Sequence, residues 1–198
     1  MSQVVKKTFT VTIEVDDNPD SPEDWDNLGT MWTLERNSRS RDKHKYGSAR
    51  EIMEAIYGES VPLHFQSDVA EMSDEKLSKA IDRYAIVLNV YKFEHSGVAY
   101  STKPFGDPWD SGQVGVIWIS KQKVREEYKV TRVAKDTYEK VVKVLESEVK
   151  VWSQYASGDV YGYIIEDEDG DELDSCWGCY GLDYTTEQAA EAVKQHLS

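Results

Sequence analysis

The sequence predicts an α+β fold: a mainly antiparallel sheet built from hairpins, with a long amphipathic helix and shorter helices packed on it. Two observations predict this class. Strand-like runs come in pairs joined by short turns, at 86–101 and at 160–180. Apolar residues recur at helical spacing along 135–155. With 198 residues and 39% hydrophobic side chains, the chain suits one domain over 1–198, with room for a small lobe.

The first quarter of the chain is predicted to contain two strands followed by a basic run. Residues 8–15 alternate apolar and polar, which predicts a half-buried strand, and the polar run 16–24 predicts a loop. A short strand is expected within 28–34. The run 36–45 then sets five positive charges against Asp42 alone, and we expect it to be an exposed, mobile loop.

Two helices and a hairpin follow. Ser48 with Glu51 forms a capping-box pattern, which predicts a helix that stops at Gly58. A short strand is expected at 61–65. A second helix begins at Ser73 or Asp74. A hairpin then pairs 86–93 with 98–101.

The segment 107–120 contains an apolar run that we expect to be buried. We expect 109–113 to form an Asx-type turn closed by Asp110, because Pro108 restricts its neighbour to an extended conformation. The turn should deliver the chain into a strand at 114–120 that is covered on both faces. Gly112 and Gly115 should let another segment pack closely, with the Trp25 or Trp177 segment as the candidates.

The last third predicts helices around one more hairpin. Ser120 is a candidate N-cap for a short helix, and a long helix is expected over 135–155. Its apolar stripe consists of Tyr138, Val141, Val142, Leu145, Val149 and Trp152. Strands at 160–166 and 173–180 should meet at an Asp169-Gly170 turn. Thr185 or Thr186 should cap a final helix.

The net charge of −14 limits the classes of molecule that the protein is expected to bind. Such acidity disfavours non-specific binding to nucleic acid or to anionic membranes, and it suits a basic partner, divalent cations or plain solubility. No run is long and apolar enough to span a membrane, and the N-terminal stretch lacks the apolar centre of a signal peptide. We therefore expect a cytoplasmic protein whose two cysteines are thiols.

Two motifs invite a metal or redox interpretation, and a structural role is favoured for both. The acidic run does not match the calcium-loop pattern, because its glycine comes too early and Gly178 stands where a bidentate Glu is needed. Cys176 and Cys179 lie in a predicted strand, where residues three apart face opposite ways. The expectation is therefore no metal and no cofactor.

Three segments set Trp and Asp beside Gly, near residues 23–32, 107–113 and 174–184. No nucleotide-binding, hydrolase or metalloprotease motif is present, so the candidate catalytic groups are carboxylates, Asp107 among them. The candidate binding residues are Asp24, Trp25, Asp26, Trp109, Asp110, Gln113, Asp174, Trp177, Glu166, Asp167, Glu168, Asp169, Asp171 and Glu172. Each Trp–Asp pair also fits a structural role, since a buried indole N–H needs an acceptor and Asp caps turns.

These segments carry a resemblance. SPEDWDNLGTM, PFGDPWDSGQVGVIWISKQKVREEY and SGDVYGYIIEDEDGDELDSCWGCYG resemble a family of uncharacterised proteins encoded by bacteriophages and other mobile elements. The resemblance covers about a third of the chain. It brings no reaction, cofactor or catalytic residue, and it implies that the protein works inside an infected bacterium.

The leading hypothesis is a phage-type cytoplasmic binding protein, not an enzyme. It would inhibit a host nucleic-acid-handling or defence protein by binding a basic surface of that host protein. The residues 158–198 favour it, because they hold eleven acidic side chains and one basic side chain. The alternative is a small-molecule-binding protein or carboxylate-dependent enzyme with a Trp/Asp-lined pocket. A third possibility is a weak phosphate contact by the basic run 36–45, and direct nucleic-acid binding should not be strong. The oligomeric state is left open.

Overall fold

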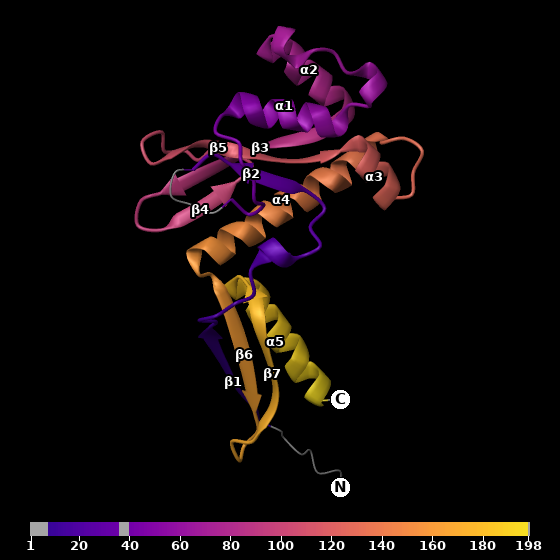
Figure 1. Ribbon diagram of the computed structural model, residues 1–198. Coiled ribbons are helices and arrows are strands. Elements are labelled where there is room, and N and C mark those ends of the chain that lie inside the picture. The colour runs from indigo at the N-terminus through magenta and orange to yellow at the C-terminus, as the bar shows by residue number, and fades with distance from the viewer. Residues whose placement is uncertain (1–7, 36–39, 198) are drawn as a thin grey trace. The chain divides into compact units, whose positions relative to one another are not determined.

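The computed structural model describes residues 8–35 and 40–197 (Figure 1). Its contacts divide the chain into two compact units. Unit 1 comprises 1–22 and 154–198, and unit 2 comprises 23–153. Each unit contains one antiparallel sheet, and helices accompany both sheets, so the predicted α+β class is confirmed. Within the described ranges, every helix falls short of the length and apolarity that a membrane span needs.

Unit 2 is built on a four-stranded antiparallel sheet with the order β2-β5-β3-β4. Its strands are β2 (Thr30–Thr33), β3 (Ala85–Glu94), β4 (Val98–Ser101) and β5 (Ser111–Ser120). The predicted hairpin β3–β4 and the predicted short strand β2 are therefore confirmed. Helices cover both faces of the sheet, with α1 and α2 on one side and α4 on the other (Figure 1).

The helices α1 (Ala49–Ser60) and α2 (Asp74–Tyr84) begin at the caps that the sequence predicts. The Ser48 and Ser73 hydroxyls accept the N–H groups of Glu51 and Lys76, respectively. The expected stop at Gly58 is wrong, because α1 continues to Ser60. The expected strand at 61–65 is also wrong, since 3-10 turns (η2, Leu63–Phe65, and η3, Val69–Glu71) connect the two helices.

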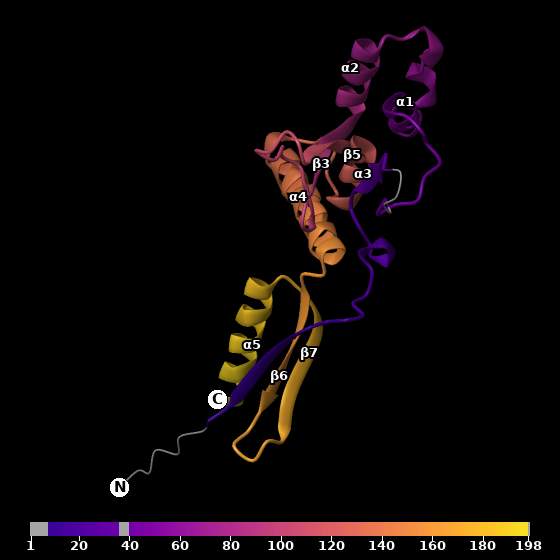
Figure 2. The same ribbon diagram turned by 90° about the vertical axis from the view of Figure 1, so that its left-hand side faces the viewer.

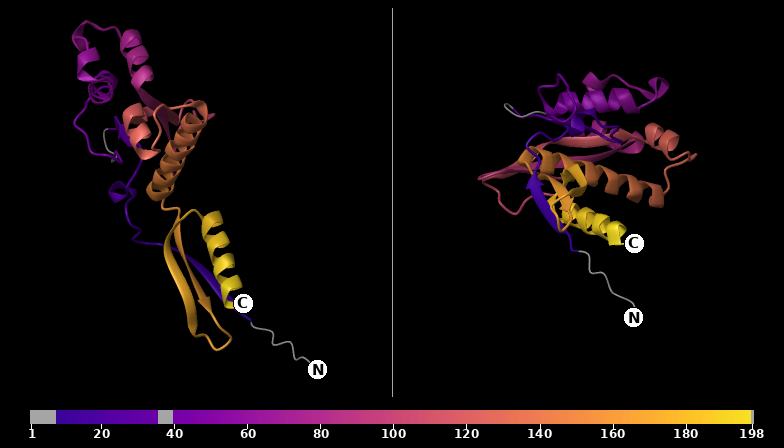
Figure 3. Two further views of the ribbon diagram at one scale, coloured as in Figure 1. Left: turned by 90° about the vertical axis from the view of Figure 1, so that its right-hand side faces the viewer. Right: turned by 90° about the horizontal axis from the view of Figure 1, so that it is seen from below.

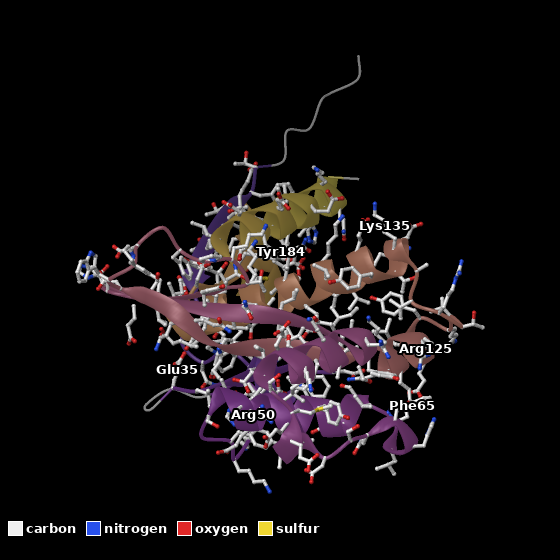
Figure 4. The ribbon with its side chains drawn as sticks, turned by 90° about the horizontal axis from the view of Figure 1, so that it is seen from above. Glu35, Arg50, Phe65, Arg125, Lys135 and Tyr184 are labelled. Carbon is white, nitrogen blue, oxygen red and sulfur yellow. The ribbon has the colours of Figure 1, made fainter. Side chains whose placement is uncertain are left out.

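The connection between α1 and α2 is held by Arg50, which Figure 4 labels on α1. Its guanidinium pairs with Glu54 at 2.7 Å and with Asp74 at 2.6 Å. It also donates to the carbonyl oxygens of Val69 at 2.7 Å and Met72 at 2.9 Å. One side chain therefore ties α1 to the connection and to the start of α2.

Aromatic and aliphatic side chains pack between these helices and the sheet. Trp32 and Trp118, from neighbouring strands, have ring centroids 5.3 Å apart. The buried members of this cluster are Trp32, Ile52, Ile56, Tyr57, Val61, Leu77, Ile81, Ala85 and Trp118. The core of unit 2 on this face is thus built from residues far apart in the chain.

The helix α4 (Lys135–Ser157) covers the other face of this sheet as far as Ser153, and its last residues belong to unit 1. Of the predicted stripe, Val141, Leu145, Val149 and Trp152 are buried, Val142 is half-buried and Tyr138 is exposed. A Cβ on Gly29 would lie 2.3 Å from Leu145, so the chain passes close to the helix there. The helix α3 (Lys121–Glu127) is capped by Ser120, as predicted.

The strand β5 begins earlier than expected, at Ser111. Asp107, and not Asp110, closes the preceding turn: its Oδ1 accepts the N–H groups of Trp109 at 2.8 Å and Asp110 at 3.3 Å. Asp110 instead pairs with His95 at 3.0 Å. The predicted close approach occurs at Gly115, where a Cβ would meet the Trp32 backbone, and not at Gly112.

The expectation of an exposed loop at 36–45 fails at Arg41, and 36–39 lie outside the described residues. Arg41 is fully buried and pairs with Asp42 at 3.0 Å and Glu148 at 2.9 Å. It also donates to the carbonyl of Gly29. The same Glu148 carboxylate accepts the N–H of Leu28 at 2.7 Å. Arg41 is therefore a structural cation that joins the basic run to α4.

Unit 1 is a three-stranded antiparallel sheet, order β1-β6-β7, with one helix against it (Figure 2). Its elements are β1 (Thr10–Val15), β6 (Val160–Glu166), β7 (Glu172–Tyr180) and α5 (Leu182–Leu197). The strands and the Asp169-Gly170 turn match the prediction. The helix begins before the predicted cap, and Thr185 donates to the Gly181 carbonyl at 2.9 Å within the first turn. The core of this unit contains Tyr163, Ile165, Ala189 and Ala192.

Candidate functional site

Charge is distributed unevenly between the two units. Unit 1 has 15 acidic residues against three lysines, a formal charge of −12, while unit 2 has 22 acidic against 20 basic residues, a charge of −2. Nearly all of the net charge therefore belongs to the smaller unit. This segregation makes the sheet of unit 1 the candidate functional site.

One face of that sheet packs against α5, and the other does not (Figures 2 and 3). Because side chains alternate along a strand, Tyr163 and Ile165 on the α5 side place Gly162, Ile164 and Glu166 on the second face. The register adds the remaining members of that face, which we name the Trp177 face: Thr10, Thr12, Glu14, Glu172, Ser175 and Trp177.

The centre of the Trp177 face is aromatic. A Cβ on Gly162 would lie 2.3 Å from the Trp177 ring, so the indole rests directly on the glycine backbone. The ring is still 48% exposed. A large indole that is held from below and half open to solvent can anchor a partner or stack under a cation.

Like charges lie opposite each other at one end of this face. Glu166 pairs in register with Thr10 on one side and with Glu172 on the other. Carboxylates on directly opposed strand positions repel each other, which costs stability. A basic partner that approached this end would relieve the repulsion.

The hairpin tip beyond these residues is closed by Asp167. Its Oδ1 accepts the N–H groups of Asp169 at 2.9 Å and Asp171 at 3.0 Å, and Gly170 adopts a φ of +84°. The carboxylate of Asp167 therefore serves the turn. Glu168, Asp169 and Asp171 are exposed at the tip, where Glu168 Oε1 also accepts the N–H of Thr8 at 3.1 Å.

The sequence predicts that Cys176 and Cys179 face opposite ways, as in a regular strand. In the structure they face the same way. Cys176 pairs with Tyr163 and Cys179 with Tyr161, two positions that share the α5 side, because a bulge adds one residue to β7 between them. Gly178 makes the bulge with a φ of +73°, and its N–H donates to Asp16 at 3.0 Å. Cys176 is exposed and Cys179 is buried.

The two thiols should differ in reactivity. Burial first, and then the neighbouring Cys176, raise the pKa of Cys179 to about 11. Since the thiolate is the nucleophile, iodoacetamide at pH 8 should modify Cys176 first. Cys179 should react about a hundredfold faster at pH 10 than at pH 8, because its thiolate fraction rises about tenfold per pH unit below the pKa.

Peptide mapping by mass spectrometry over time measures both rates, and urea-unfolded protein is the control in which the two rates should converge. Faster modification of Cys179 at pH 8 would contradict the assignment of the buried thiol.

The other Trp–Asp segments belong to unit 2. Asp24 ends a 3-10 turn (η1, Pro22–Asp24), and Trp25 and Asp26 follow it; Trp25 is 43% exposed. Trp109 lies in the loop between β4 and β5 and is 93% exposed. Asp174, in unit 1, lies 3.9 Å from His196. Unit 2 has a groove between α1, α2 and the sheet, and Gln113 lines it. Trp25 and Trp109 are not among its lining residues.

Sequence reasoning missed Asn89, which lines the same groove. The signal was present: Asn89 is the one polar residue in the apolar run 86–90. The side chain of Asn89 is exposed, as is that of Gln113. Gln113 donates to Asn89 Oδ1 at 3.1 Å.

Over residues 8–35 and 40–197, no three His, Cys, Asp or Glu side chains gather closely enough to hold a metal ion. Comparison with protein-family models gives no match, and curated proteins and solved structures give none either.

Proposed function

We propose that the protein is a phage-type, non-enzymatic binding protein that docks unit 1 on a basic surface of a host protein, as an inhibitor of a nucleic-acid-handling or defence protein would. The observation that carries the proposal is the segregation of charge, −12 in unit 1 against −2 in unit 2. Concentrated charge of one sign steers association with an oppositely charged partner and selects against acidic ones.

The Trp177 face adds apolar contact area, which the acidic side chains cannot provide. Electrostatic attraction at exposed positions is screened by salt and gives modest affinity. A half-exposed indole adds apolar area and a π-face for an arginine or lysine of the partner. We therefore place the contact on this face and on the adjacent hairpin tip, with the indole at its centre and the carboxylates around it.

Neutralising the tip should abolish binding while the fold is kept. The test variant replaces four carboxylates by amides of the same shape: Glu168→Gln, Asp169→Asn, Asp171→Asn and Glu172→Gln. Asp167 is left intact because its carboxylate closes the turn. The matched control makes the same charge change at exposed positions of unit 2: Glu71→Gln, Glu127→Gln, Asp136→Asn and Glu139→Gln.

Both variants and the parent protein are used as bait in a bacterial lysate at low salt and at about 0.5 M salt, where the screening length is only a few ångströms. The parent and the unit 2 control should capture the same basic protein at low salt and lose it at high salt. The tip variant should not capture it. Equal capture by the tip variant, or a captured protein with an acidic surface, would contradict the proposal.

A further inference from the structure

Unit 2 contains a groove of about 510 Å³ between α1, α2 and the sheet. This volume lies within the range of small-molecule sites, roughly 300–1,000 Å³. Its walls are mainly aliphatic, from Leu34, Ala49, Ile52, Met53, Ile56, Ile81, Val87, Val114 and Val116. Its polar lining consists of Ser78, Asp82, Asn89 and Gln113, with Gly115 in the floor.

A β-bulge places the two amides in this groove. Val90 pairs with Gly115, whereas Tyr91 pairs with Gln113, so Val114 is an extra residue in β5. The extra residue turns Gln113 onto the face that carries Asn89 and Tyr91, where a regular strand would direct it to the other face. The hydrogen bond from Gln113 to Asn89 at 3.1 Å follows from this turn. Bulges of this kind commonly redirect a side chain at a functional site.

The amides form an ordered chain with free capacity at its end. Asn89 Nδ2 donates to the Tyr91 hydroxyl at 3.4 Å, and Asn89 Oδ1 accepts from Gln113. A glutamine amide has one acceptor oxygen and two N–H donors. Gln113 can therefore present its Oε1 and its second N–H, one acceptor and one donor side by side, to a molecule in the groove.

Arg50 ties together the two helices that wall the groove. From α1 it pairs with Asp74 at the start of α2 and donates to the carbonyl oxygens of Val69 and Met72 in the connection. Gly115, which also lines the groove, lies against the backbone of the neighbouring strand, where a Cβ would be 2.0 Å from the Trp32 carbonyl oxygen. Walls that are tied together reduce the entropic cost of binding.

We propose that this groove binds a neutral, largely apolar small molecule that offers an amide- or lactam-type edge, one N–H beside one C=O, to Gln113. The aliphatic walls take the apolar body. The charged group in the described lining is the Asp82 carboxylate, and it disfavours anionic ligands such as carboxylates and phosphates. The site is independent of the Trp177 face, which belongs to unit 1.

The test uses the full chain and three matched probes in isothermal titration. 2-Quinolone is a flat, neutral lactam; N-methyl-2-quinolone keeps its shape but lacks the N–H; 2-naphthoate keeps the aromatic body but is an anion. 2-Quinolone should bind about fivefold or more tightly than its N-methyl analogue, which is the effect of one net hydrogen bond. 2-Naphthoate should bind most weakly.

Two variants locate the binding. Gln113→Leu should bring 2-quinolone and its N-methyl analogue to equal affinity, because it removes the hydrogen-bonding edge. Ser78→Trp should block both by filling the mouth from an exposed position on α2. Gln122→Leu, on exposed α3, is the control that should change neither affinity, and thermal melts confirm that each variant is folded.

No measurable binding of 2-quinolone, equal binding of the two quinolones by the parent protein, or unchanged binding by folded Ser78→Trp would each overturn the proposal. Retained capture of the basic host protein by Ser78→Trp would show that the two sites act separately.

Discussion

Replacing Arg41 by methionine is expected to lower the free energy of unfolding by about 3–5 kcal/mol. Arg41 is fully buried and pairs with Glu148 and Asp42. Methionine fills similar space but leaves the Glu148 carboxylate, which is 12% exposed, without its cation. An unpaired buried charge costs far more than a surface ion pair contributes. Glu148 also accepts the N–H of Leu28, so the turn before β2 should loosen at the same time.

Urea unfolding followed by tryptophan fluorescence measures this change. Arg83→Met is the matched control, because Arg83 is exposed on α2, and its effect should stay within about 0.5 kcal/mol. A loss of stability in Arg41→Met as small as that of the control would mean that Arg41 is not held in the core of unit 2.

The second large effect is expected at Leu145. Leu145→Ala should cost about 2–5 kcal/mol, because the side chain is fully buried in the middle of the α4 stripe. It fills the space between Gly29 and Ile117, both of which approach the same point. Glycine at position 29 leaves no side chain that could move into the cavity, so the site should collapse poorly.

Lys143→Ala, on the exposed side of the same helix, is the control for helix propensity and should change stability by less than about 0.5 kcal/mol. A loss below about 0.5 kcal/mol for Leu145→Ala in the same urea titration would contradict the assignment of this stripe to the core.

The elements that sequence reasoning predicted well are those specified by neighbouring residues. Capping serines at 48, 73 and 120 each accept a backbone N–H three residues on, as their local patterns indicate. The stripe of α4 and the turn at Gly170 are local in the same sense. Local signals of this kind do not depend on the rest of the fold.

The elements that sequence reasoning missed depend on distant partners or on one inserted residue. In the sequence, Arg41 cannot be distinguished from the other charges of the basic run, because its partner Glu148 lies 107 residues away. The bulges at Val114 and Gly178 each add one residue to a strand and so reverse the faces that strict alternation predicts. That reversal brings Gln113 to Asn89 and sets both cysteines on one side.

The candidate site was predicted in part. The acidic hairpin and Trp177 were among the candidates, and the structure adds that Gly162 supports the indole and that Glu166 faces Glu172. The predicted grouping of Trp with Asp did not distinguish these residues from Trp109, which lies in an exposed loop. Composition locates the charge along the chain, but only the strand register shows which carboxylates share a face.

The most direct test of the proposed function is the association rate of the captured host protein at increasing salt, for the parent and for the variant with the neutralised hairpin tip. Electrostatic steering by unit 1 predicts that the parent rate falls at least about tenfold between roughly 0.02 and 0.2 M salt. The variant should start from a lower rate and depend much less on salt. Equal rates and equal salt dependence in the two proteins would contradict binding through the acidic hairpin.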